Sequence, residues 1–162
     1  MFSITLSQAT RAAAPEEDPG LSEDYETAVM EACELLAETD CEFRVRGFGA
    51  DWPVDVWVDL STFMEDLPEV LEALRGSAEA MSDFYEQGIQ RTLYYRPEGD
   101  RVRIRCESRT DWVPDPDTEW VGRDELDRML SDVAVAFARS LRLVSPVTAA
   151  REPFASWAEG RV

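Results

Sequence analysis

Two short stretches of the chain combine carboxylates with indole rings, and these residues are the candidates for chemistry. In the first stretch, Asp55, Trp57 and Asp59 occupy every second position of the run 52–60, whose other members are apolar. A period of two is typical of a β-strand that is wet on one face. We therefore expect these three side chains to face solvent. An exposed indole among charges resembles the centre of a protein interface, so they are predicted to bind a partner.

The second stretch, 111–120, places four carboxylates and two indoles within ten positions. Its candidate partner-binding residues are Asp111, Trp112, Asp115, Asp117, Glu119 and Trp120. Pro114 and Pro116 restrict the backbone and lower the entropy lost on binding. We interpret the stretch as an acidic loop that faces a partner, the alternative being a solvated connector. A calcium site is not predicted, because the ligand order and turn glycine of an EF-hand are missing.

Composition excludes several kinds of catalysis. The chain has no histidine and no lysine, and its 16 arginines face 34 carboxylates, for a net charge of −18. Without imidazole or amine there is no Ser-His or Cys-His pair, no Schiff base and no P-loop lysine. Cys33, Cys41 and Cys106 are odd in number and widely spaced, so we expect free thiols and neither a disulfide framework nor a zinc site. No cofactor is predicted.

The elements that must position these residues follow from periodicity. Helical spacing predicts helices over 22–38, over a segment that starts at Thr62 or Asp66 and ends at Gly76, and over 123–144. Alternation predicts a hairpin of 43–46 and 52–60, strands over 82–87, 90–96 and 101–108, and a possible short strand over 2–6. The expected fold class is α+β, with an antiparallel sheet of about four to six strands, helices packed on one face and the order α-β-β-α-β-β-β-α.

The wet face of this sheet carries the charges of alternate strand positions. The expected members are Arg44, Arg46, Asp55, Asp59, Arg101, Arg103 and Arg105, together with Trp57. One interpretation is a ladder of cross-strand ion pairs that keeps the sheet soluble. The other is a binding surface centred on Trp57.

The length of 162 residues predicts a single domain over 1–162. Within it, 1–20 is expected to be a mobile N-terminal arm, because 11–20 is rich in small, acidic and turn-forming residues, and 145–162 an irregular tail without a period. The opening residues lack a basic start and a long apolar run, so neither a signal peptide nor a membrane span is predicted. A cytoplasmic location is the resulting expectation.

Part of the chain resembles known proteins. The runs WPVDVWVDLSTFMEDLPEVLEAL and DFYEQGIQRTLYYRPEGDRVRIRCES, with the junction Asp59–Phe63 (DLSTF) and a closing helix, are similar to a pattern of small acidic uncharacterised proteins of high-GC bacteria. Some of these are grouped with the immunity proteins of polymorphic toxin systems. The resemblance covers about 41–144 and implies a cytosolic antidote that occludes a toxin.

The leading functional hypothesis is an acidic protein-binding module that docks and blocks a basic partner, because the negative field speeds encounter with a positive protein. Direct binding of nucleic acid is disfavoured, since phosphate contacts need a positive surface. Two other classes stay open: a hydrolase or metal-dependent enzyme built from carboxylates, and a DNA-mimic inhibitor or structural subunit. The sequence does not determine the oligomeric state or the partner.

Overall fold

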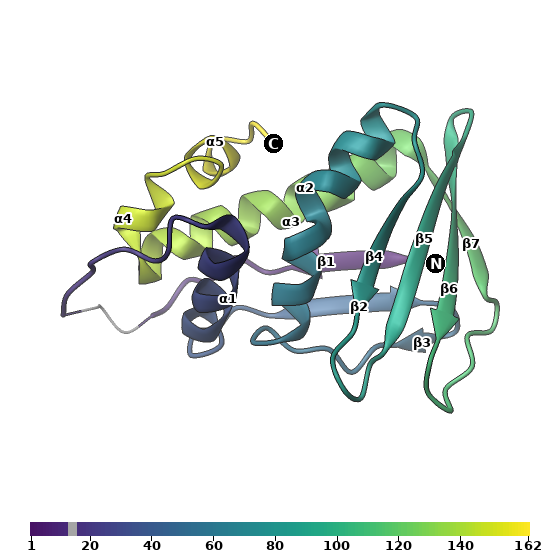
Figure 1. Cartoon of the computed structure of the whole chain (residues 1–162), viewed down its shortest axis with the longest axis horizontal. Helices are drawn as coiled ribbons and strands as arrows, with labels where there is room; N and C mark the ends of the chain where they lie inside the picture. Colours follow the sequence, from purple (N-terminus) through teal and green to yellow (C-terminus); the bar gives the residue numbers. More distant parts are fainter. Residues whose placement is uncertain (13–15) are drawn as a thin grey trace.

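The computed structural model describes residues 1–12 and 16–162 and shows an α+β fold with two antiparallel sheets (Figure 1). The first sheet has the order β1-β2-β3 and the second the order β4-β5-β6-β7. The strands are β1 (Ser3–Leu6), β2 (Phe43–Gly47), β3 (Ala50–Asp51), β4 (Ala80–Phe84), β5 (Arg91–Glu98), β6 (Arg101–Ser108) and β7 (Thr118–Gly122). The helices are α1 (Tyr25–Leu36), α2 (Asp59–Arg75), α3 (Arg123–Val144), α4 (Pro146–Ala149) and α5 (Phe154–Ala158). The predicted fold class is confirmed, but its strands divide between two sheets.

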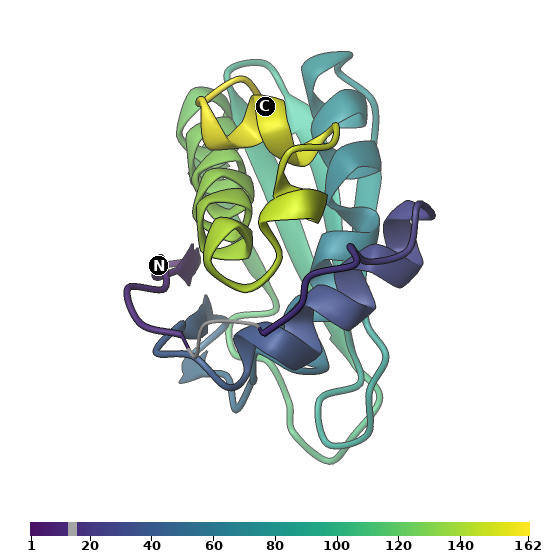
Figure 2. The same cartoon turned by 90° about the vertical axis from the view of Figure 1, so that its left-hand side faces the viewer.

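The helices cover one face of the four-stranded sheet, as predicted. Figure 2 shows α2 and α3 side by side in front of this sheet, where α2 packs along β4 and α3 against β7. On β6, the side chains of Val102, Ile104 and Cys106 are buried beneath the helices, whereas the arginines between them are on the opposite face. The period of two in the sequence therefore identified both faces of this strand correctly.

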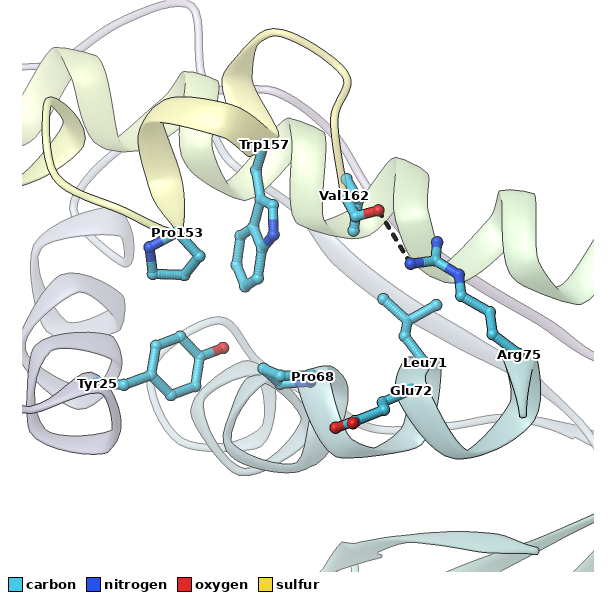
Figure 3. A pocket seen from close by; sticks show the side chains of 8 residues that line it. All are labelled: Tyr25, Pro68, Leu71, Glu72, Arg75, Pro153, Trp157 and Val162. Carbon is cyan, nitrogen blue, oxygen red and sulfur yellow. Dashed lines mark hydrogen bonds between the residues drawn. The ribbon is translucent and has the colours of Figure 1, made fainter. Parts of the chain in front are cut away.

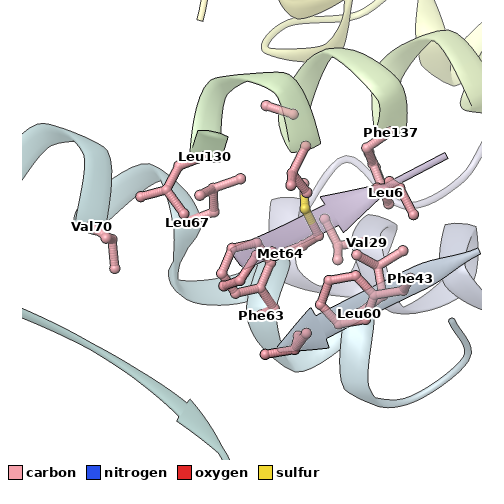
Figure 4. Close-up of a cluster of buried hydrophobic side chains, with 14 of the residues drawn as sticks. Leu6, Val29, Phe43, Leu60, Phe63, Met64, Leu67, Val70, Leu130 and Phe137 are labelled. Atoms are coloured by element: carbon pink, nitrogen blue, oxygen red, sulfur yellow. The ribbon is translucent and has the colours of Figure 1, made fainter. Parts of the chain in front are cut away.

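The hydrophobic core joins both sheets to the helices. Figure 4 shows its centre, formed by Leu6, Val29, Phe43, Leu60, Phe63, Met64, Leu67, Val70, Leu130 and Phe137. These side chains come from β1, β2 and the three longest helices. Each large apolar side chain that is fully buried stabilises the fold by roughly 1.5–3 kcal/mol relative to exposure. Phe84, Leu93 and Ile104 of the four-stranded sheet belong to the same core, so both sheets are held in one packed unit.

Two helices lie where helical spacing predicted them. The bounds of α3, Arg123–Val144, match the predicted bounds. Helix α1 begins at Tyr25, three residues after the predicted start, because Asp24 is its N-cap and accepts a hydrogen bond from the Thr27 amide (3.0 Å). Ser22 instead accepts a hydrogen bond from the Asp24 amide, outside the helix.

The predicted strand over 52–60 is wrong. Pairing in β3 stops after Asp51, and α2 begins at Asp59, ahead of both predicted starts. The cause is the Asp55 side chain, which accepts hydrogen bonds from the amides of Val58 (2.8 Å) and Asp59 (3.2 Å) and closes a turn. Such side-chain bonds to nearby amides favour turns and helix starts over strands.

Pro68 lies inside α2, where a proline lacks the amide that would bind the carbonyl of residue 64. The Tyr25 hydroxyl supplies the missing donor, because it donates a hydrogen bond to the Met64 carbonyl at 2.7 Å. A side chain of α1 therefore replaces the backbone hydrogen bond that α2 lacks at Pro68. The proline is tolerated in this helix because another element provides the bond.

This arrangement predicts a coupled effect of two substitutions. Tyr25→Phe should lower the free energy of unfolding by about 1–2 kcal/mol, the cost of an unsatisfied buried carbonyl. The ring that stacks on Phe154 at 6.0 Å is kept. In a Pro68→Ala background the new amide can bind the Met64 carbonyl, so Tyr25→Phe should cost less than about 0.5 kcal/mol. Urea unfolding of the four variants measures the cycle, and equal costs in both backgrounds would contradict this role of Tyr25.

The ends of the chain are more regular than predicted. The possible short strand predicted over 2–6 is confirmed as β1, and Phe2 and Ile4 are buried, so this part of the predicted mobile arm packs into the fold. The carboxylate of Asp18 accepts hydrogen bonds from the Ser145 hydroxyl and the Val147 amide, both at 2.8 Å. Residues 13–15 of the predicted arm lie outside the described residues. In place of an irregular tail, α4 and α5 lie within 145–162, and both pack on α3.

Candidate functional site

The first predicted group, Asp55, Trp57 and Asp59, lies at the turn before α2. Trp57 is exposed (57%), in agreement with the prediction, but Asp59 is buried (4% exposed) and accepts a hydrogen bond from the Asp55 amide at 2.9 Å. The prediction that Asp59 faces solvent is therefore wrong. Burial raises the pKa of Asp59 to about 6, and the carboxylates of Asp55 and Glu86 add to the rise. The side chains of Asp55 and Asp59 both accept hydrogen bonds from amides of the turn before α2. Of the three predicted residues, Asp55 and Trp57 are exposed.

The residues of the second predicted group, 111–120, lie in different environments. Its exposed carboxylates are Asp111, Asp115 and Asp117. Trp112 turns inward, where its ring lies 3.6 Å from the Arg91 guanidinium and 6.0 Å from the ring of Trp52. The amide of Asp115 donates to the Phe48 carbonyl (3.0 Å), which ties this loop to the turn between β2 and β3.

Glu119 and Trp120 belong to β7, a strand that the sequence analysis missed because it assigned these residues to the loop. The Glu119 carboxylate accepts from the Phe48 amide and lies 3.4 Å from the ammonium group of Met1, so it joins the two sheets. Trp120 is on the outer face, and the Arg101 guanidinium lies 4.7 Å from the centre of its ring. The nine predicted residues therefore do not form one site.

The structure instead gathers carboxylates on a surface that we call the acidic face. Its members are Glu26 of α1, Asp55 of the turn before α2, Glu65, Asp66 and Glu69 of α2, and Glu86 of the β4–β5 loop. The Tyr85 hydroxyl donates to both oxygens of Glu65 at 3.0 and 3.1 Å, and the Asp83 amide donates to Asp66 at 3.0 Å. These bonds hold the side chains of α2 beside the end of β4.

The carboxylates of the acidic face repel one another. Partial burial raises the pKa of Glu65, and the charges of Glu26, Asp66 and Glu86 raise it further. Partial burial also raises the pKa of Asp66, with contributions from Asp83, Glu69 and Glu26. In the described part of the chain, no arginine nitrogen lies within 4.0 Å of a carboxylate of this face. The members of the face therefore form no ion pair with arginine in the described residues, and Arg109 binds the neighbouring Asp83 at 2.7 Å.

Sequence reasoning missed most of the acidic face because its members lie on elements far apart in the chain. One local signal existed, since Glu65, Glu69 and Glu72 recur at helical spacing along the exposed side of α2. The contacts that bring α1 and the end of β4 beside this row are tertiary.

Arginines gather on the outer face of the four-stranded sheet. Arg96 pairs directly with Arg103 across β5 and β6, and Tyr94 pairs with Arg105, whose guanidinium lies 4.5 Å from the tyrosine ring centre. Arg96 also lies 3.5 Å from Glu79. The predicted members Arg44 and Arg46 lie on β2 in the other sheet, so the expected single ladder is divided between two surfaces.

An apolar groove of about 550 Å³ lies between α1, α2 and α5 (Figure 3). Trp157 of α5 forms one wall, and Tyr25, Pro68 and Leu71 form the other. The rings of Tyr25 and Trp157 are nearly perpendicular, with centroids 6.1 Å apart. At one end the Arg75 guanidinium donates a hydrogen bond to the main-chain oxygen of Val162 at 2.9 Å. A groove of this volume, walled by aromatic rings, is typical of small-molecule sites.

These surfaces are the basis for inferring a function. Comparison with protein-family models, curated proteins and solved structures found no match. Among residues 1–12 and 16–162, no group of three or more acidic or cysteine side chains is arranged to hold a metal ion. Within the same residues, no helix is long and apolar enough to cross a membrane.

The three cysteines are free and buried, as predicted from their number and spacing. Burial raises the pKa of Cys41 to about 11 and that of Cys106 to about 12, and it raises the pKa of Cys33 as well. Because the thiolate is the nucleophile, these thiols have the character of core residues and not of catalytic groups.

Proposed function

We propose that the chain is an acidic protein-binding module that docks a basic partner protein and blocks it, as an immunity-type inhibitor in the cytoplasm does to a toxin. The observation that carries the proposal is the acidic face, on which carboxylates from separate elements lie close enough to raise one another's pKa values and, among the described residues, form no ion pair with arginine. The pKa values of Glu65 and Asp66 are raised by partial burial first and by the neighbouring carboxylates second, so these two carboxylates are less readily ionised in the folded chain than in water. A partner that brings Lys or Arg side chains relieves this repulsion.

Exposed apolar side chains beside the carboxylates supply anchors for such a partner. Trp57 stands at the start of α2 with 57% of its surface exposed, and Tyr85, which binds Glu65, is 48% exposed. Met30 is exposed one helical turn from Glu26 on α1. Aromatic and methionine side chains are enriched at the centres of protein interfaces, where they contribute most of the binding energy. The acidic face therefore combines charge with apolar anchors.

The proposal predicts binding that depends on this face and not on net charge alone. Wild-type chain immobilised on a resin should retain a basic protein from the native host at low salt and release it at high salt. The combined variant Glu65→Gln, Glu69→Gln, Glu86→Gln should retain at least tenfold less. Purified wild-type chain should also abolish the activity of the retained protein.

A matched variant distinguishes binding at the acidic face from attraction by the overall negative charge. Glu16→Gln, Glu17→Gln and Asp132→Asn remove the same charge from exposed positions outside the acidic face. This variant should retain the partner within about twofold of wild type. Equal loss in both variants, or recovery of no basic protein at either salt concentration, would count against the proposal.

A further inference from the structure

We infer that the groove between α1, α2 and α5 binds a small organic cation with an apolar, aromatic body. The apolar part of the site is the space between Trp157 and the opposite wall of Tyr25, Pro68 and Leu71 (Figure 3). The rings of Tyr25 and Trp157 contact each other edge to face, at 84° and with centroids 6.1 Å apart, so no group fits between these two rings. An aryl group of the ligand instead packs against Trp157 and the apolar side chains of Pro68 and Leu71.

The polar groups of the groove are mostly satisfied within the protein. The Tyr25 hydroxyl donates to the Met64 carbonyl at 2.7 Å. The guanidinium of Arg75 is neutralised by Asp127, to which it donates two hydrogen bonds at 2.7 and 3.0 Å. An anionic ligand therefore meets no free positive charge at this end of the groove.

Glu72 is the charged group of the lining that has no such partner. Its carboxylate is exposed on α2 at the edge of the groove, one turn after Pro68, and no arginine nitrogen of the described residues lies within 4.0 Å of it. The complementary ligand carries its positive charge beside Glu72 and packs its apolar body against Trp157 and Leu71. The field of the −18 chain also raises the local concentration of cations.

Three probes with one carbon skeleton test the charge selectivity: 4-phenylbutylamine, 4-phenylbutan-1-ol and 4-phenylbutanoate. Titrations of 15N-labelled wild-type chain are followed by NMR through the Trp157 indole resonance, assigned with Trp157→Phe. The amine should bind most tightly and shift this resonance, the alcohol more weakly, and the carboxylate least. Equal affinities for the three probes, or shifts by the amine confined to other parts of the molecule, would overturn the inference.

A pair of substitutions distinguishes the site from the overall negative field. Glu72→Gln should weaken amine binding about threefold, as expected for an exposed ion pair, and leave alcohol binding unchanged. Glu34→Gln removes the same charge from an exposed position on α1, outside both the lining and the acidic face, and should leave amine binding within about 1.5-fold of wild type. Equal weakening by the two variants would show attraction by the field alone and would overturn the inference. The result does not depend on the acidic face binding a protein.

Discussion

Replacing Arg91 with methionine is expected to raise the free energy of unfolding by about 2 kcal/mol. Arg91 is 4% exposed, and neither Nε nor Nη1 has a hydrogen-bond partner in the described part of the chain. Removal from water lowers the pKa of its guanidinium. Each unsatisfied buried donor costs about 1–3 kcal/mol, and methionine removes both donors while keeping an unbranched apolar chain between the indoles.

The opposing contribution comes from the two tryptophans. The guanidinium carbon lies 4.7 Å from the ring centre of Trp52 and 3.6 Å from that of Trp112. A desolvated cation–π contact contributes about 2 kcal/mol, and methionine replaces part of it with sulfur–aromatic contacts of up to about 1.5 kcal/mol. The balance therefore favours the substitution.

Urea unfolding of wild type, Arg91→Met and Arg91→Lys at constant pH tests this balance. Arg91→Lys should lower the free energy of unfolding by about 2 kcal/mol or more, because an ammonium is more strongly hydrated and cannot stack between two rings. A loss of stability above about 1 kcal/mol in Arg91→Met would mean that the indoles more than compensate for the missing hydrogen bonds.

Local patterns predicted much of the fold, and the exceptions have local causes. Helix α3 and strands β5 and β6 were predictable because their apolar side chains recur with one period over eight or more residues. The alternation of Val54, Val56 and Val58 suggested a strand, yet a single side chain, Asp55, closes a turn there. Helix α2 then extends through Pro68 because α1 supplies a hydrogen bond, which no sequence window contains.

The candidate surfaces were harder to predict because they depend on contacts between distant segments. Trp112 and Trp57 both lie in acidic stretches of the sequence, yet Trp112 packs on Arg91 and Trp57 is exposed. The groove needs Trp157 of α5, which lies in a tail without an apolar period. The net charge of −18 was evident from the start, but its concentration on the acidic face follows only from the packing of α1, α2 and β4.

The same packing predicts that the protein becomes more stable as the pH falls from 7 to about 5. The pKa of Asp59 rises from 3.8 to about 6 on folding, and those of Glu65 and Asp66 rise as well. Between the unfolded and folded pKa values the native state binds more protons, so its stability decreases as the pH rises through this window. For Asp59 the shift corresponds to about 3 kcal/mol at most.

Asp59→Asn should therefore raise the free energy of unfolding at pH 7 by up to about 3 kcal/mol and have little effect near pH 4. The asparagine oxygen can still accept the hydrogen bond that the Asp55 amide donates at 2.9 Å to the aspartate. Asp18, Asp24, Asp40 and Asp127 have lowered pKa values, and their contributions are lost progressively as the pH falls below about 5, so they oppose the gain from Asp59 only at the acid end of this window. Urea unfolding from pH 4 to 8 measures the slopes. Asp132→Asn, which removes an exposed charge from α3, should leave the wild-type slope unchanged. A wild-type stability that increases from pH 5 to 7 would mean that Asp59 ionises normally and that its burial is relieved by solvent.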